Sequence, residues 1–255
     1  MYASERHEVI AGMVRQRGRV SVTDVAGEFG VTTETVRRDL AQLERVGLLR
    51  RVHGGAVPVT ALTVVEPGVA ERDSTQAEAK DRIALAAVAM LPGDGGSILL
   101  DAGTTTGRLA ARLPLDRRLV VVTNSVPIAT RVSGSGALRL HLLGGRVRGT
   151  TQAAVGDDTV AALRDLRVDT AFVGTNALTC DRGLTTPHHE EAAVKRAMVA
   201  AGRQVVVLAD SSKIGAEHLI RFAEIGDLDV LITDDAVEDA DVTALEAGGV
   251  EVVVA

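Results

Sequence analysis

The chain has 255 residues, of which 46% are hydrophobic, 2% aromatic and 24% charged, and its formal net charge at pH 7 is −6. This length favours two domains, and the lack of any run of about 18 apolar residues argues against a membrane-spanning helix. The charged N-terminus lacks the apolar core of a signal peptide, and the single cysteine, Cys180, cannot form an internal disulfide, so we expect a cytoplasmic protein without a membrane partner.

Charge is distributed unevenly along the chain. Residues 1–57 hold nine arginines, no lysine and seven acidic residues, which gives a net charge of +2, whereas the remaining residues carry −8. A small basic segment joined to an acidic body directs the search for a nucleic-acid-binding module to the first 57 residues.

Three helices are predicted in this basic segment. The first has apolar residues at helical spacing over residues 4–18, and the second covers residues 22–29 and ends at Gly30, where a helix commonly takes a left-handed residue. Thr32 is expected to cap the third helix. The apolar residues of the third helix share one side, at Val36, Leu40, Leu43 and Val46.

The turn between the second and third helices has the features of a helix-turn-helix. Ala26 is small enough for two helices to cross closely, and Gly30 allows the chain to turn sharply. Residues 47–56, which end in Gly-Gly-Ala, are expected to form a short hairpin beside the third helix. Paired arginines such as Arg37 and Arg38 are often merely solvated, so a plain three-helix bundle is the alternative to DNA binding.

Residues 18–56 resemble the N-terminal domain of the DeoR family of bacterial transcriptional regulators. The matching residues are Thr35, Val36, Arg37, Arg38, Asp39, Leu40, Leu43, Gly47, Arg51, His53, Gly54, Gly55 and Ala56. The resemblance implies a winged helix-turn-helix domain, residues 1–57, that binds double-stranded operator DNA as part of a symmetric homo-oligomer, a dimer or a tetramer. We expect Asp39 to pair with an arginine. The candidate DNA-binding residues are Thr32, Thr33, Thr35, Arg37, Arg38, Arg51 and His53.

A linker is predicted over residues 58–75, where Pro58, Pro67 and Gly68 interrupt the pattern. From residue 76 onward, apolar runs that suit buried strands alternate with segments of helical periodicity. This alternation predicts an open α/β sheet with helices on both faces over residues 76–255. The predicted strands cover residues 97–101, 118–123, 138–145, 168–174, 204–210, 229–234 and 250–254.

The loop after the first of these strands suits a phosphate group. Gly103 permits a close backbone approach, and the next three residues add hydroxyl groups beside the free N–H groups of a helix start. The stretch contains neither the P-loop pattern nor the G-x-G-x-x-G dinucleotide fingerprint, so a dinucleotide sensor is a weak alternative. A threonine-capped helix without a ligand is the simpler interpretation.

Polar side chains and glycines at the other strand ends extend this candidate site. Cations suit a phosphate and carboxylates suit hydroxyl groups, so the set suits a phosphorylated polyol. The candidate effector-binding residues are Asp101, Gly103, Thr104, Thr105, Thr106, Asn124, Gly144, Gly145, Arg148, Gly174, Lys195, Asp210 and Lys213.

The pair Glu191 and Lys195 at helical spacing has two interpretations: a surface salt bridge, or a lysine that reaches a bound anion. Adjacent His188 and His189 point apart on a helix and have no partner at ligand spacing, so no metal is expected. We expect Cys180 to be a free loop thiol.

The C-terminal part resembles the sensor domain of the same family. The matching stretches are "DAGTTT", "VTNS", "LLGG", "GLTTPHHEEAAVKRAM" and "LADSSKIG". The resemblance implies a fold similar to ribose-5-phosphate isomerase and a phosphorylated sugar as effector, with no cofactor. Ala102 departs from the family, which often has Ser at this position. We expect a repressor of a sugar-metabolism operon that its effector releases from DNA; the alternative is an isomerase-like enzyme in which Lys195 and a carboxylate transfer protons.

Overall fold

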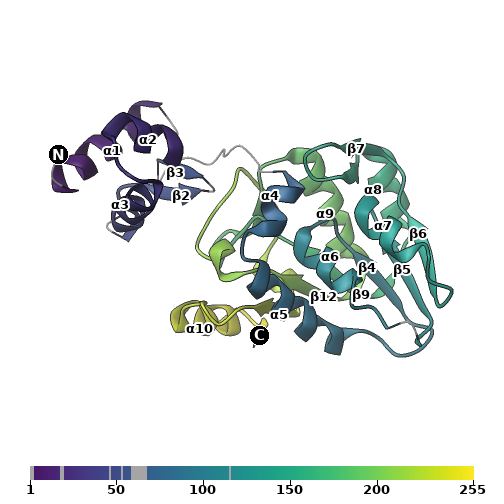
Figure 1. Ribbon diagram of the computed structural model, residues 1–255. Coiled ribbons are helices and arrows are strands. Elements are labelled where there is room, and N and C mark those ends of the chain that lie inside the picture. The colour runs from purple at the N-terminus through teal and green to yellow at the C-terminus, as the bar shows by residue number, and fades with distance from the viewer. Residues whose placement is uncertain (1–2, 18–19, 46, 53, 59–67, 115) are drawn as a thin grey trace. The chain divides into compact units, whose positions relative to one another are not determined.

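The computed structural model describes residues 3–17, 20–45, 47–52, 54–58, 68–114 and 116–255 (Figure 1). The chain forms two compact units, Met1–Val65 and Glu66–Ala255. Helix α4 (Val69–Ser74) lies within the segment 58–75 that composition indicates as a linker, and it belongs to the second unit. Among the described residues, no helix combines the length and the apolar character needed to cross a bilayer.

The first unit is a three-helix domain with a small antiparallel sheet in the order β1-β3-β2. Apolar residues of all three helices form its core, as their helical spacing predicts. The described elements are α1 (Ala3–Arg17), β1 (Val20–Ser21), α2 (Val22–Phe29), α3 (Thr33–Arg45), β2 (Arg50–Val52) and β3 (Gly55–Val57). The predicted hairpin is confirmed, and the first unit has the elements of a winged helix-turn-helix.

Two glycines of this unit have mechanical roles. Gly30 ends α2 in the left-handed region with φ 62°, and its N–H donates to the carbonyl of Ala26. Gly55 pairs with β1 so closely that an added Cβ would lie 1.8 Å from the carbonyl oxygen of Val20. The wing therefore packs against β1 only because residue 55 has no side chain.

The second unit is built on a seven-stranded parallel sheet in the order β15-β14-β12-β9-β4-β5-β6. The predicted open α/β sheet is confirmed, with all seven predicted strands present. These strands are β4 (Ser97–Leu100), β5 (Leu119–Thr123), β6 (Leu138–Leu142), β9 (Val168–Gly174), β12 (Gly202–Leu208), β14 (Val230–Thr233) and β15 (Glu251–Val254). The chain runs outward from β4 in one direction and returns at β9 to run in the other, so the strand order reverses between β4 and β9.

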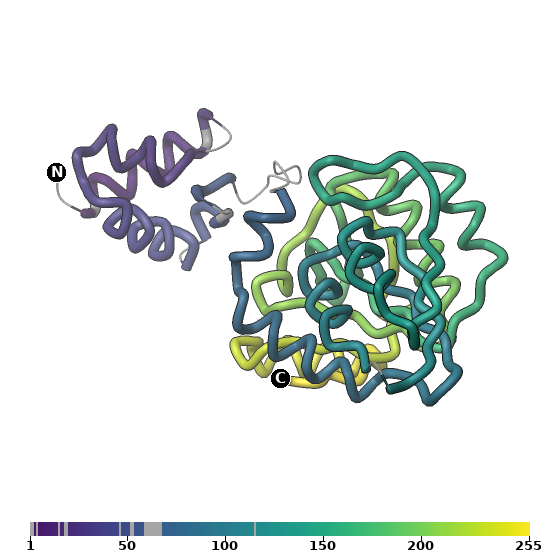
Figure 2. The backbone as a smooth tube through the Cα atoms, turned by 45° about the vertical axis from the view of Figure 1, so that its right-hand side comes forward, coloured from purple at the N-terminus to yellow at the C-terminus, as the bar shows by residue number. Residues whose placement is uncertain are grey.

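Helices cover both faces of this sheet because side chains alternate along each strand. In β4, Leu99 joins one apolar cluster, while Ile98 and Leu100 join the other. One face packs against α5 (Ala77–Ala87), α6 (Thr104–Ala110) and α7 (Val126–Val132), and the other packs against α8 (Asp157–Arg164), α9 (His189–Ala201) and α10 (Asp239–Ala247). The end of the chain lies beside α5, where Arg82 Nε donates to the carbonyl of Ala255 at 3.1 Å (Figure 2).

The described residues of this unit also form five short strands and three 3-10 turns. The strands are an antiparallel pair, β7 (Arg146–Arg148) and β8 (Ala153–Val155), and a sheet of β10 (Ala177–Thr179), β11 (Gly183–Thr186) and β13 (Ile220–Ala223). The 3-10 turns are η1 (Val88–Met90), η2 (Ser211–Lys213) and η3 (Ile225–Asp227). The sequence did not predict these strands, because three or four residues give no recognisable alternation.

Candidate DNA-binding surface and effector site

The start of α3 is capped by Thr32, as predicted. Its hydroxyl accepts a hydrogen bond from the N–H of Thr35 at 3.2 Å and lies 2.9 Å from the Thr35 hydroxyl. Thr32 and Thr33 are exposed, whereas Thr35 is half-buried. The cap fixes the direction in which the helix start presents its hydroxyls and N–H groups to solvent.

The arginine pair lies on the exposed side of α3. Arg37 forms a weak surface ion pair with Glu34, with 3.3 Å between Nη1 and Oε2, and both side chains are more than half exposed. Arg38 is exposed and has no ion-pair partner in the part of the chain that the structure describes. Both guanidinium groups are therefore free to contact a phosphate or a base edge at little cost.

Asp39 pairs with an arginine, as expected, but the arginine lies on α1. Its carboxylate accepts from Arg6 Nε at 2.5 Å and Nη2 at 3.1 Å, and it lies 2.8 Å from His7 Nε2. Burial acts to raise the pKa of Asp39, but the bonds from Arg6 and His7 outweigh burial and lower it. Asp39 thus connects α3 to α1 and does not pair with Arg37 or Arg38, which stay exposed to solvent.

The wing contributes a further cation. Arg51 is exposed, and its backbone N–H donates to Glu44 Oε1 at 2.7 Å, which ties β2 to α3. His53, which is also a predicted DNA-binding residue, lies outside the described residues.

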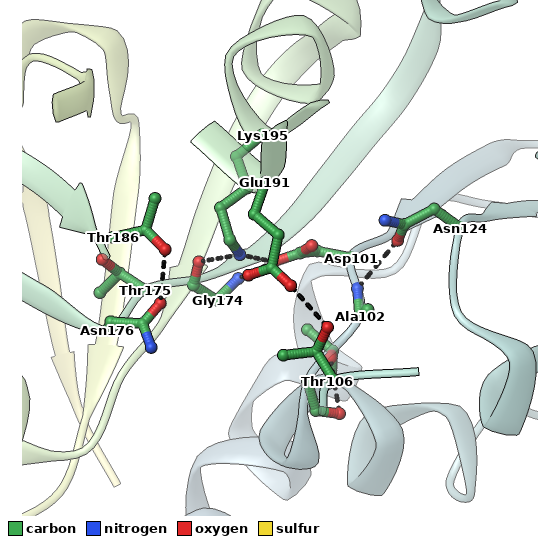
Figure 3. Close-up of polar contacts among 12 residues, drawn as sticks. Asp101, Ala102, Thr106, Asn124, Gly174, Thr175, Asn176, Thr186, Glu191 and Lys195 are labelled. Atoms are coloured by element: carbon green, nitrogen blue, oxygen red, sulfur yellow. Dashed lines mark hydrogen bonds and ion pairs between the residues drawn. The ribbon is translucent and has the colours of Figure 1, made fainter. Parts of the chain in front are cut away.

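In the second unit, the point at which the strand order reverses is occupied by a buried ion pair (Figure 3). Asp101, at the end of β4, accepts from Lys195 Nζ and from the N–H of Gly174 at 3.0 Å. Lys195 also donates to the carbonyl of Gly174 at 2.8 Å. Complete burial acts to raise the pKa of Asp101, and the lysine opposes that shift. The hydrogen-bonding groups of three predicted site residues are therefore paired with one another: Asp101, Gly174 and Lys195.

Glu191 and Lys195 do not form the surface salt bridge that their spacing suggests. Both side chains are buried, and Glu191 instead accepts from Arg148 and from the hydroxyl of Thr151 at 2.5 Å. Burial acts to raise the pKa of Glu191, but the nearby Lys195 and these two bonds lower it. Arg148, a predicted effector ligand, therefore already has a buried carboxylate partner.

Other predicted site residues have structural partners. Asn124 accepts from the N–H of Ala102 and donates to the carbonyl of Ala154, both at 3.0 Å, so it joins the loop after β4 to β8 (Figure 3). The carbonyl of Gly144 accepts from the Thr159 hydroxyl at 2.6 Å. At Gly145 an added Cβ would lie 2.2 Å from the same hydroxyl oxygen, which accounts for the second glycine.

A cleft of about 310 Å³ lies beside the start of α6. Of the predicted effector residues, Gly103 and Thr104 line it, whereas Thr105 and Thr106 follow within α6, and Thr106 donates to the carbonyl of Gly103 at 3.1 Å. Asp210 and Lys213, at the end of β12, are not part of the lining. The cleft is lined by Val69, Asp73, Asp81, Gly103, Thr104, Gly107, Arg108, Ala111, Arg112, Ser125, Pro127, Ile128, Arg131 and Thr151.

The arginines that line this cleft were not among the residues predicted from the sequence. Arg108 follows Thr104 by four residues and so shares its side of α6, a spacing that could have indicated it. Arg131, on α7, is exposed and has no ion-pair partner within the described ranges. With the hydroxyls of Ser125 and Thr151, these side chains can bind an anion that also carries hydroxyl groups.

Two further predictions concern histidine and cysteine. The prediction that His188 and His189 point apart is wrong: their rings stack with centroids 5.0 Å apart, because His188 is the extended residue before α9 and only His189 is helical. The described residues contain no group of three side chains suited to a metal ion. Cys180 is an exposed free thiol, as expected.

Comparisons with known proteins match both units. A family model described as the DeoR-like helix-turn-helix domain matches residues 6–61, and one described as the DeoR C terminal sensor domain matches residues 75–235. The HTH-type transcriptional regulator GlpR of Haloferax volcanii is 36% identical over 253 residues, 99% of this chain and 98% of that protein. The HTH-type transcriptional repressor GlcR of Bacillus subtilis is 32% identical over 255 residues, 100% and 97% of the two chains. The glycerol-3-phosphate regulon repressor of Escherichia coli is 31% identical over 234 residues, 92% of each.

Solved structures of similar fold are more distant. Ribose 5-phosphate isomerase A from Neisseria gonorrhoeae has a TM-score of 0.41 and 16% identity, covering 57% of this chain and 56% of that chain. The sorbitol operon regulator SorC from Klebsiella pneumoniae has a TM-score of 0.37 and 13% identity, covering 81% of this chain and 89% of that chain. Likeness at this level carries no argument about function.

Proposed function

Because the chain belongs to the DeoR family of transcriptional regulators, we propose that it represses a sugar-metabolism operon and leaves its operator when a phosphorylated sugar binds. The family makes it a DNA-binding regulator rather than an enzyme. Relatives support the finer statement through their names, which include a glycerol-3-phosphate regulon repressor and a lactose phosphotransferase system repressor.

The cleft beside α6 is the observation that carries the effector assignment. Arg108 and Arg131 provide guanidinium groups, which bind phosphate with two parallel N–H bonds. Thr104, Ser125 and Thr151 add hydroxyls that suit the polyol part of a sugar phosphate. Lys195, which the enzyme alternative requires, is not among the lining residues and is held by Asp101 instead.

For the first unit, we assign DNA contact to the exposed side of α3 and to the wing. Arg37, Arg38 and Arg51 supply the cations, and Thr32 and Thr33 lie at the helix start, where phosphate contacts fix the register on DNA. Operators of helix-turn-helix regulators are commonly read by symmetric oligomers, so the proposal includes a cytoplasmic homodimer or homotetramer.

A thermal-shift screen of the full-length protein against sugar phosphates tests the effector assignment, because a ligand that binds only the folded state raises its melting temperature. A phosphorylated sugar should raise the melting temperature, and its unphosphorylated form should not. Equal shifts from both forms, or no shift from any phosphate, would reject the phosphorylated effector. Turnover of a sugar phosphate by the purified protein would instead favour the enzyme.

A further inference from the structure

Helix α4 is the first described element of the second unit, and Gly68 is its N-cap residue. None of its residues is buried, so apolar packing does little to hold it. The N–H of Val69 donates to the carbonyl of Thr150 at 3.1 Å. At the other end, Lys80 Nζ donates to the carbonyls of Arg72 at 2.5 Å and Thr75 at 2.7 Å. A helix held mainly by such polar contacts belongs to the low-stability parts of a fold.

Arg108, which lines the cleft, also contacts α4. Arg108 Nη2 donates to Asp73 twice, to the carbonyl oxygen at 2.8 Å and to Oδ1 at 3.0 Å. Arg108 Nη1 donates to Asp81 at 2.9 Å. The cleft therefore shares one guanidinium group with α4, and this contact joins the candidate effector site to the first described helix of the second unit.

A bound anion could replace Asp73 as the hydrogen-bond partner of Arg108. The Asp73 side chain is 55% exposed, and ion pairs with an exposed partner contribute little. The Nε of Arg108 is buried and has no hydrogen-bond partner within the described residues, so one N–H donor of this guanidinium forms no hydrogen bond there. Asp81 would not be left unpaired by a change at Arg108, because Arg112 Nη2 also binds it at 2.5 Å.

Resting on the effector function proposed above, we propose that Arg108 is the switch residue of the sensor unit. An anionic group bound in the cleft takes the Arg108 guanidinium from Asp73, and α4 keeps the attachment through Lys80 but loses the one through Arg108. A phosphate can accept two charge-assisted bonds from a guanidinium, whereas the Asp73 carboxylate accepts one bond from Arg108, at Oδ1. In this proposal, release of α4, the first described helix of the second unit, is the step between effector binding and weaker DNA binding.

The turn after α4 supports this account. Gln76, between α4 and α5, has φ 53° and ψ 39°, the left-handed region, although it is not a glycine. Such a conformation is unfavourable for a residue with a side chain and persists only where the surrounding contacts impose it. The turn directly follows the Arg108 contact at Asp73 and the Lys80 contact at Thr75, so a change at Arg108 acts close to a backbone conformation that depends on its surroundings.

The first arm of the test measures anion binding by the full-length protein with glycerol 3-phosphate and with inorganic phosphate as probes. Arg108→Gln should weaken binding of the better probe at least tenfold, about 1.4 kcal/mol. Asp73→Asn should strengthen it, by about threefold or more, because the competing carboxylate is gone. Arg118→Gln, which removes an exposed ion pair outside the cleft lining, is the matched control and should bind like the wild type.

The second arm follows amide hydrogen exchange in residues 69–75. The probe should accelerate exchange there in the wild type. Without the probe, Asp73→Asn should exchange faster than the wild type, because its neutral amide oxygen accepts a weaker bond from Arg108 than the carboxylate does. If the probe binds but Asp73→Asn matches the wild type in both affinity and exchange, the switch is refuted and the effector site survives. If Arg108→Gln binds like the wild type, the switch is equally refuted. If no sugar phosphate binds the wild type at all, the proposed effector function fails first and the switch with it.

Discussion

Replacement of Lys195 by methionine tests whether this lysine stabilises the fold or binds the effector. The side chain of Asp101 is 2% exposed and that of Lys195 is 7% exposed, so the variant leaves a buried carboxylate with the N–H of Gly174 as its remaining hydrogen-bond donor. Breaking a buried ion pair from one side costs about 3–5 kcal/mol. With a slope of about 2 kcal/mol per molar urea, the unfolding midpoint of the sensor unit should fall by about 2 M.

Far-UV circular dichroism is the appropriate probe, since the chain has no tryptophan. The double variant Asp101→Asn with Lys195→Met removes the unpaired charge and should recover at least about 1 kcal/mol of the loss. Arg118→Met removes a cation whose side chain is 80% exposed and should leave the midpoint unchanged. The structural role would be refuted if the urea midpoint of Lys195→Met lay within about 0.5 M of the wild-type midpoint and the double variant were no more stable than Lys195→Met. Lys195 would then again be a candidate anion ligand.

Three further variants test separate parts of the molecule. Arg38→Ala should weaken operator binding by about 1–3 kcal/mol in a mobility-shift titration without changing the melting temperature, and unchanged affinity would contradict its place on the DNA-facing surface. Gly55→Ala should lower the melting temperature of the first unit, because the new Cβ would lie 1.8 Å from the carbonyl of Val20, whereas Gly27→Ala, with nothing within 4 Å, should not; equal melting of the two variants would count against this packing. Burial lowers the pKa of Lys80 from 10.5 to about 8, so between these pH values the unfolded chain binds more protons and this group makes stability rise with pH. The stability of the wild type relative to Lys80→Met should therefore increase by at least about 1 kcal/mol across that window, and parallel curves in urea denaturation would show that Lys80 does not titrate there.

The long elements of the fold could be predicted from the sequence, because apolar runs and helical spacing are local signals. The strands β10, β11 and β13 could not, since each is only three or four residues long. β10 and β11 form a short hairpin with each other, and β11 also pairs with the distant β13. Gly183 illustrates the reason: an added Cβ would lie 2.2 Å from the carbonyl oxygen of Ala223, a contact that its neighbours in sequence do not reveal.

The candidate site could be predicted only in part. The loop at Gly103 and Thr104 is recognisable because its residues are adjacent in the chain, and it does line the cleft. The role of Lys195 was not recognisable, because its partner Asp101 lies 94 residues away and meets it only once β4 and β9 are neighbours. Arg131 was missed for the same reason, since its place in the cleft depends on how α7 packs.

We expect an anion bound in the cleft beside α6 to lower the affinity of the first unit for DNA. Fluorescence anisotropy of a labelled operator duplex, selected from random DNA with the full-length protein, measures this coupling directly when the sugar phosphate that shifts the melting temperature is titrated in. The account predicts at least a fivefold loss of DNA affinity, about 1 kcal/mol of coupling, which Arg131→Gln should abolish at the same concentration of effector. DNA affinity that stays constant while the sugar phosphate saturates its site would contradict the account.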